Sequence, residues 1–423
     1  MSQDQLTIMV CIQLQKSFLI TPYLALIGTI PVAQATSTSE DDAFDSRLDD
    51  LEERYEGEIN DLRFEIDLLH SRLDENDKAS STPLSPTAFN PLISVVGTLL
   101  SRTDNLTILN DEGDAIDDSF RLSEVELDFR SAIDPWADGV VIGAIESEAT
   151  GEYAFGIEEG YVVLKRLPFT EWTPLGMSLK VGRFRTAFGR INKVHTHNLP
   201  WSTRPLAVTQ FLGHEGYLRE GISGAFHLPA PSKSDSINLT VEMLSGGGIA
   251  IDKEAPASHY APLGHLAWFR ELNAEHTLEV GLSARGGNRE RALYGADFTY
   301  AWKPLGGGEW NSFIFGGEYF LNDSDVPELD RARGSYLWAQ NQLSRQLYLG
   351  ARYDFVEELG DRSMDTTRSG LWLSYYTSEF LRLRAGVEHT NSDLAEIDGL
   401  KSVFVELSFV FGAHGSDPYW VNR

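Results

Sequence analysis

At positions 124–130 the chain reads Glu-Val-Glu-Leu-Asp-Phe-Arg, a strict alternation of charged and apolar side chains. Because successive side chains of a β-strand point to opposite faces, this stretch predicts a strand with one charged and one apolar face. The same alternation returns at 177–181, 237–243, 297–302, 347–354, 381–388 and 403–409. The fold class predicted from this pattern is therefore all-β.

The nature of the two faces separates two all-β folds. A soluble sandwich packs its apolar faces together and leaves the outer faces wet. Here the polar faces are charged on many strands, and aromatic residues gather near strand ends, at Trp136, Trp172, Trp302, Trp310 and Trp338. Apolar residues facing lipid, polar residues facing water inside and aromatic girdles are typical of a transmembrane antiparallel β-barrel.

The spacing of the alternating segments predicts about sixteen strands between residues 92 and 412. Short connections such as 134–138 and 342–345 alternate with long ones such as 104–118 and 185–218. Outer-membrane barrels have short periplasmic turns and long external loops, so this parity supports the same fold. The segments at 262–270 and 333–341 alternate weakly, which leaves fourteen strands as an alternative.

Composition excludes several classes of protein. Among 423 residues, 63 Asp and Glu outnumber 35 Lys and Arg, giving a formal net charge of −28. Such an acidic chain is not expected to bind nucleic acid. The single cysteine, Cys11, excludes disulfide frameworks and thiolate zinc sites.

The N-terminal region predicts an exported protein with an α-helical segment before the barrel. Residues 1–35 read as a signal peptide, because an apolar run follows Lys16 and ends at Ala33-Gln34-Ala35. Translation starts at Met1 or Met9. Residues 36–80 form an acidic segment with apolar residues every three or four positions, typical of a coiled coil.

The coiled coil predicts that the chain associates with two further copies of itself. Burying its seam over 41–78 favours a homo-oligomer, with a trimer as the natural number. The alternatives are a helix that packs on its own barrel and a periplasmic spacer. A Pro-rich linker (81–91) leads to the barrel (92–412), which a tail (413–423) follows. The predicted location is the bacterial outer membrane, with lipid as the barrel's partner and the coiled coil in the periplasm.

A barrel of sixteen strands encloses a water-filled lumen. The longest external connection, 185–218, is the third from the N-terminus, and by analogy with general porins we expect it to fold inward and narrow the pore. The candidate constriction residues are Arg183, Arg185, Arg190, Lys193, Arg204 and Arg219 on or beside this loop, and Glu124, Glu126, Asp128, Arg382 and Arg384 on the wall. Basic groups opposite acidic ones would favour small polar solutes. The alternative is that these charges pair with each other and only solvate the lumen.

The same loop offers candidate metal ligands. His195 and His197 are one residue apart, and His214 and Glu215 follow. These four side chains could bind Zn²⁺ if the loop folds back, since neutral imidazole supplies the lone pair. The alternative is that the histidines are hydrogen-bonded within an ordered loop. No cofactor is required for either interpretation.

Catalysis is not expected. An outer-membrane lipase would need a Ser–His pair on a lipid-facing strand. The strand histidines, His265 and His389, have no evident serine partner on that face.

Residues 180–189 read Lys-Val-Gly-Arg-Phe-Arg-Thr-Ala-Phe-Gly, and Asn192, the His-x-His pair, Arg204-Pro-Leu and Gly213-x-Glu-Gly follow. This region resembles bacterial outer-membrane proteins labelled zinc-regulated TonB-dependent outer membrane receptors, and more distantly phosphate-selective porins. The match is best over 90–228. It implies an outer-membrane barrel in which His195 and His197 match the group's His-x-His.

The sequence thus predicts a porin-like channel for passive diffusion of small polar or charged solutes. The alternative is a metal-binding or surface-recognition barrel without energised transport.

Overall fold

The computed structural model describes residues 91–108, 120–147, 153–167, 174–247, 260–287, 291–304, 310–323, 331–413 and 418–421. The predicted signal peptide, coiled coil and nearly all of the linker lie outside the described residues, so the oligomer expected from the coiled coil stays a prediction. The barrel belongs to one compact unit, residues 86–423. No helix in the described ranges is long and apolar enough to cross a membrane.

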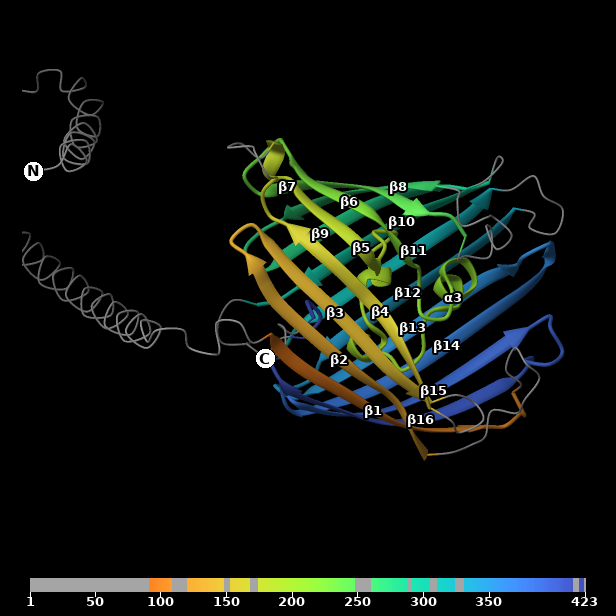
Figure 1. Ribbon diagram of the computed structural model, residues 1–423. Helices are drawn as coiled ribbons and strands as arrows, with labels where there is room; N and C mark the ends of the chain where they lie inside the picture. The colour runs from red at the N-terminus through yellow and green to blue at the C-terminus, as the bar shows by residue number, and fades with distance from the viewer. Residues whose placement is uncertain are drawn as a thin grey trace, which may run out of the picture. The chain divides into compact units, whose positions relative to one another are not determined.

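Sixteen antiparallel strands form a closed barrel in which every strand pairs with its neighbours in sequence and β1 pairs with β16 (Figure 1). The strands are β1 (Leu92–Asp104), β2 (Phe120–Asp134), β3 (Ala137–Ser147), β4 (Tyr153–Leu164), β5 (Ser178–Arg185), β6 (Leu218–Leu228), β7 (Asp235–Ser245), β8 (Tyr260–Glu271), β9 (His276–Gly286), β10 (Ala292–Trp302), β11 (Phe313–Asp323), β12 (Ala332–Gln342), β13 (Leu347–Glu358), β14 (Asp361–Ser378), β15 (Leu381–Ser392) and β16 (Leu400–Gly412). This confirms the all-β class and the count of sixteen, and the alternative of fourteen strands is wrong.

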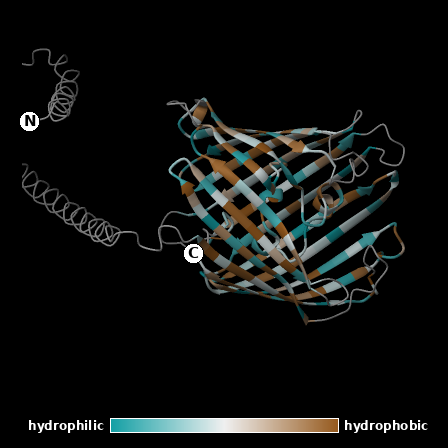
Figure 2. Ribbon diagram, viewed as in Figure 1, coloured by the Kyte–Doolittle hydropathy of each residue, from teal (hydrophilic) through white to brown (hydrophobic). Residues whose placement is uncertain are grey.

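Most outward-facing side chains of the strands are apolar, and many inward-facing ones are polar. In β7, Val241 and Met243 are each 49% exposed, whereas Glu242 between them is 2% exposed. Figure 2 shows the same alternation as bands of hydrophobic and hydrophilic colour along the strands. Closure leaves no strand edge unpaired, which hydrocarbon requires of any backbone that crosses it. The fold is therefore that of a porin-type outer-membrane barrel.

The connections divide between the two ends of the barrel. At the end where β1 begins, here called the turn end, β2 joins β3 and β14 joins β15 through short turns. At the opposite end, the loop end, β1 joins β2 and β7 joins β8 through long segments. Three connections break the parity, because β4–β5 and β10–β11 are long at the turn end and β13–β14 is short at the loop end.

The connection from β5 to β6, residues 186–217, lies inside the barrel and is here called the inner loop (Figure 1). It contains the short 3₁₀ helices η3 (Ile191–Lys193) and η4 (Thr196–Asn198) and the helix α3 (Leu206–Leu212). Another 3₁₀ turn, η2 (Pro174–Gly176), precedes β5. The inner loop carries most of its apolar side chains into one buried cluster with wall residues of β11–β14, which includes Phe188, Ile191, Leu199, Trp201, Phe211, Phe320, Tyr336, Trp338 and Trp372.

Two inward-facing glycines let the inner loop approach the wall. A Cβ atom on Gly295 would lie 2.7 Å from the ring of Phe188. A Cβ atom on Gly334 would lie 2.8 Å from both Ala207 Cβ and the ring of Phe211. These are distances at which the loop would have to move, so the missing side chains are part of how the loop docks.

We expect Gly334→Ala to loosen α3 from the wall, because the added methyl group overpacks the contact with Ala207 and Phe211, at a cost of about 1–3 kcal/mol. Hydrogen–deuterium exchange of residues 206–212 in the detergent-solubilised protein should become faster. Gly350→Ala is the matched control, because its Cβ would meet nothing closer than 3.8 Å. Equal exchange in both variants would contradict this account of α3 docking.

Candidate functional site: the barrel lumen and its inner loop

Carboxylates of the wall hold the first part of the inner loop through its backbone. Glu318 Oε1 accepts from the N–H groups of Arg190 and Ile191, each at 2.8 Å. Glu242 Oε2 accepts from the N–H of Ala187 at 3.1 Å. Hydrogen bonds to a charged acceptor are the stronger kind, so these acidic side chains serve as anchors for the loop.

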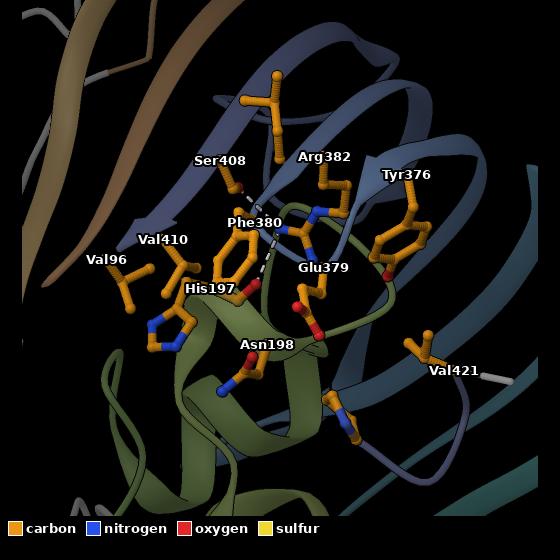
Figure 3. Close-up of a pocket in the computed structure, with 12 residues that line it drawn as sticks. Val96, His197, Asn198, Tyr376, Glu379, Phe380, Arg382, Ser408, Val410 and Val421 are labelled. Atoms are coloured by element: carbon orange, nitrogen blue, oxygen red, sulfur yellow. Dashed lines mark hydrogen bonds between the residues drawn. The ribbon is translucent and has the colours of Figure 1, made fainter. Parts of the chain in front are cut away.

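Arginines on the other side of the wall hold the middle of the inner loop through its carbonyl groups. The donors and acceptors are Arg382 to His197 O at 2.8 Å, Arg384 to Leu199 O at 2.6 Å, and Arg352 to Thr203 O at 2.6 Å. Figure 3 shows Arg382 reaching between the backbone of His197 and the hydroxyl of Ser408. Glu406 pairs with Arg382 at 2.6 Å and with Arg384 at 3.3 Å. Both arginines were expected at the constriction, and the structure places them as buried supports of the loop.

A histidine–glutamate cluster forms where the inner loop meets β2 and β4, and it consists of Glu126, Glu158, Glu159, His195 and His197. His195 Nδ1 lies 2.8 Å from Glu126 Oε2 and 3.2 Å from Glu158 Oε2, and its Nε2 lies 2.8 Å from Glu159 Oε1. His197 Nδ1 lies 3.3 Å from Glu126 Oε2. The His-x-His pair therefore meets glutamates of the wall.

An irregularity in β4 makes this cluster. Ile142 pairs with Glu159 while Gly143 pairs with Ile157, so Glu158 has no partner in β3. Such a β-bulge breaks the alternation of faces, and both Glu158 and Glu159 are buried. Glu159 was not among the predicted site residues. Two consecutive acidic residues beside glycines in a strand were the sequence signal that could have indicated the bulge.

The charge state of His195 follows from these neighbours. Burial by itself lowers the pKa of an imidazole, but the adjacent carboxylates of Glu126, Glu158 and Glu159 outweigh burial and hold the pKa of His195 well above its ordinary value. These acidic neighbours therefore favour the protonated form of His195.

Several predicted constriction residues are engaged in local pairs inside the lumen. Arg185 pairs with Glu158 at 2.8 Å and also donates to the carbonyl of Glu215. Arg204 donates to the carbonyl of Val194 and to the hydroxyl of Thr196, each at 3.1 Å. Burial lowers the pKa of Arg204 to about 10. The alternative that lumen charges pair with one another therefore describes Arg185, whereas Arg204 donates to neutral groups of the inner loop.

The remaining basic candidates have other positions. Arg183 pairs with Glu220 at 2.7 Å, and both follow the alternation of the exposed residues Val181 and Ile222, which places them on the outer face. Arg219 donates to the carbonyl groups of 246 and 247 at the loop end. These two arginines are not brought into the cluster around His195.

Asp128 and Glu124 lie on β2 on either side of Glu126. Asp128 pairs with Arg130 at 2.7 Å. Glu124 offers a carboxylate oxygen close to Glu126 and His197, within 4.8 Å of their ligand atoms. The three acids of β2 are thus all on the lumen side, as expected.

The predicted metal ligands divide into two groups. His195 and His197 meet at the wall, and their rings lie 5.8 Å apart. His214 is exposed, and Glu215 clusters with Glu146 and Glu158 instead of with a histidine. Within the described residues, no group of close metal-ligating atoms includes His214. The structure therefore replaces the predicted partners His214 and Glu215 by glutamates of β2 and β4.

A cavity of about 390 Å³ lies between the inner loop and strands β2 and β4–β7. Its polar and charged lining consists of Arg130, Glu159, Tyr161, Ser178, Lys180, Arg185, Lys193, His195, Ser223, Thr240 and Glu242. Lys180 Nζ lies over the ring of Tyr161 at 4.5 Å, and burial lowers the pKa of Lys193. Arg and Lys outnumber Glu in this lining, so its formal charge is positive although the net charge of the whole chain is negative.

On the opposite side of the lumen, the described tail residues 418–421 pack against the wall and the inner loop. Trp420 is 1% exposed, its carbonyl accepts from Gln340 at 2.7 Å, and its ring meets Trp338 edge to face at 6.0 Å. Tyr419 lies under the guanidinium of Arg190 at 4.1 Å. The cavity left there, drawn in Figure 3, holds only about 40 Å³. The return of the tail into the lumen could not be predicted from strand alternation.

The strand histidines have partners that differ from those of a catalytic Ser–His pair. His265 Nε2 lies 3.2 Å from Asp297 Oδ2, and His389 Nδ1 lies 3.3 Å from the carbonyl of Leu400.

Comparison with known proteins gives matches of low sequence identity. No family model matches the chain. A curated relative, an uncharacterized protein of Aquifex aeolicus (strain VF5), is 23% identical over 347 residues, which cover 71% of this chain and 70% of the relative.

Solved structures similar to this chain include OmpF of Salmonella typhi in complex with daunomycin. The two chains are 12% identical, and the match covers 77% of this chain and 99% of that chain with a TM-score of 0.49. The outer membrane channel DcaP of Acinetobacter baumannii has 10% identity, coverage of 76% and 98%, and a TM-score of 0.48. An anion-selective porin from Comamonas acidovorans has 11% identity, coverage of 76% and 98%, and a TM-score of 0.47.

The TonB-dependent receptor label attached to the resembling group is not supported. The outer-membrane transporters of that kind have about 22 strands and a plugged lumen. The present barrel has sixteen strands, and its lumen is occupied by its own inner loop.

Proposed function

We propose that this protein is a porin-like channel of the bacterial outer membrane, through which small polar or charged solutes diffuse passively. The solutes pass along the wall formed by β2 and β4–β7, beside the inner loop, which narrows the lumen. The observation that carries this proposal is the charged cavity of about 390 Å³ between that wall and the inner loop. It lies in a barrel whose outer face is apolar.

The same cavity supports a preference for anions. Its lining has four Arg and Lys residues and two Glu residues. Of these bases, Lys180 and Lys193 are amines, which present a compact point charge to a passing solute. A pore lined by basic groups attracts anions and repels cations.

Planar-bilayer recording of the purified, folded protein tests the proposal. We expect discrete conductance steps and, in a KCl gradient, a reversal potential on the anion-selective side. The double variant Lys180→Glu/Lys193→Glu should shift the reversal potential toward cations, because it reverses two charges in the passage. Lys233→Glu is the matched control, since Lys233 is exposed in the β6–β7 turn. Folded protein that gives no conductance would end the channel proposal, whereas conductance without the shift would end only the account of selectivity.

A further inference from the structure

Ligand-type atoms of the histidine–glutamate cluster form two overlapping triads, each with its atoms within 4.8 Å of one another: Glu126 with Glu158 and His195, and Glu126 with Glu124 and His197. His197 Nδ1 lies 3.3 Å from Glu126 Oε2, and His195 Nδ1 lies 3.2 Å from Glu158 Oε2. Tetrahedral zinc with bonds of about 2.0–2.2 Å separates its ligand atoms by about 3.3 Å. The remaining separation, 2.8 Å between His195 Nδ1 and Glu126 Oε2, has only to widen slightly.

Ion pairing brings these groups together, but three of their polar atoms do not reach the geometry of a hydrogen bond. Glu126 Oε2, His195 Nδ1 and His197 Nδ1 are all buried, and none of them makes a hydrogen bond of acceptable geometry with the described residues. His197 is 8% exposed and aims this nitrogen at Glu126. Buried polar atoms are nearly always satisfied, so three of them gathered at one point indicate a ligand that accepts their lone pairs.

The surrounding groups are those that orient metal-bound histidines. His195 Nε2 lies 2.8 Å from Glu159 Oε1, so an Nε2–H donor to that carboxylate leaves the Nδ1 lone pair for the metal. Arg382 holds the carbonyl of His197 at 2.8 Å, which fixes the backbone that carries the second imidazole. Glu159 and Arg382 are positioning residues in this arrangement.

The charges of the cluster also favour a cation. Glu126, Glu158 and Glu159 are each less than a tenth exposed, and Arg185 is the guanidinium that pairs with Glu158. Buried carboxylates are paired or coordinate metals, because an isolated buried charge is costly.

We propose that Glu126, Glu158, His195 and His197 form a binding site for a divalent transition-metal cation, for which Zn²⁺ is the best match. Two imidazole nitrogens and two carboxylate oxygens make a donor set that zinc prefers, without thiolates. The site joins the inner loop to β2 and β4 at the edge of the charged cavity, which His195 also lines. It does not depend on the channel proposal, since a metal can bind whether or not solutes pass.

Calorimetric titration of the detergent-purified full chain with ZnCl₂, after treatment with a chelator, tests the site. We expect one equivalent of zinc to bind. His197→Gln and Glu126→Gln should each weaken zinc binding by at least about 100-fold. Loss of a residue that only hydrogen-bonds to a metal ligand weakens binding by about 10–100-fold, so a larger loss marks a direct ligand. The matched controls are His214→Gln and Glu220→Gln, because His214 is exposed and Glu220 pairs with Arg183 on the outer face. Both controls should bind zinc as the unmodified protein does.

Binding of Co²⁺ in place of Zn²⁺ is a second test, which uses the protein without any change of residue. The unmodified protein loaded with Co²⁺ should show the intense visible absorption of a tetrahedral centre. The proposal is overturned if the unmodified protein binds no zinc, or if His197→Gln and Glu126→Gln retain its affinity. Weak octahedral absorption with Co²⁺ would likewise overturn it. A protein that conducts but binds no zinc would refute this site and leave the channel intact.

Discussion

Replacing residues 187–216 by a four-residue Gly-Ser turn should raise the single-channel conductance several-fold. The inner loop occupies the lumen with a buried apolar cluster that includes Phe188, Trp201 and Phe211. An open barrel of sixteen strands leaves an aqueous channel. The ends of the replaced segment are close, since the N–H of Thr186 donates to the carbonyl of Tyr217 at 2.9 Å, so a short turn can join them.

The comparison is made by single-channel recording of both proteins in the same salt. As a control, residues 393–399 of the β15–β16 connection are replaced by an equally short turn. This connection lies at the loop end and should leave the conductance unchanged. If the variant without the inner loop folds and conducts no better than the unmodified protein, the inner loop does not narrow the passage.

The second large effect is expected at Arg352, whose side chain is 0% exposed. Its guanidinium lies 2.9 Å from Asp354 and 3.3 Å from Glu388. It also lies over the ring of Trp201 at 4.9 Å. Arg352→Met would leave two buried carboxylates short of a partner, which costs about 3–5 kcal/mol. Arg368, 3.8 Å from Asp354, stays in place and compensates for part of this loss.

The consequence is measured as the unfolding rate of the detergent-solubilised barrel on heating, because such proteins unfold irreversibly and a rate is the meaningful quantity. Arg352→Met should unfold much faster, and adding Asp354→Asn should restore part of the difference by removing one uncompensated charge. The control Arg130→Met breaks an exposed pair with Asp128, which is worth about 0–1 kcal/mol. Equal rates for Arg352→Met and Arg130→Met would show that the buried pair does not stabilise the fold.

The barrel itself could be predicted from the sequence because its signal is local. Alternation along a strand depends only on which face each side chain takes, and lipid outside with water inside makes that alternation strong. Even the weakest segments, expected at 262–270 and 333–341, are strands β8 (Tyr260–Glu271) and β12 (Ala332–Gln342).

The site could be predicted only in part. The lumen face of β2, including Glu126, follows from alternation, and the spacing of His195 and His197 singled out the pair. Their partners did not follow, because Glu158 and Glu159 face inward together through a bulge that alternation excludes. Arg183 was expected at the constriction because it lies beside the loop, although continuing the alternation from Val181 puts it on the outer face.

The sequence alone therefore determined the membrane-type barrel, the approximate number of its strands and the chemical character of each face, all of which are set by neighbours along one chain segment. The closed structure fixed the count at sixteen. Only the tertiary structure decided which lumen charges pair, where the inner loop docks and that Trp420 returns into the barrel. These outcomes depend on contacts between residues far apart in sequence, such as Arg190 with Tyr419 and Gln340 with Trp420. Closure of the barrel brings those residues together, and no periodicity of the chain records which of them will meet.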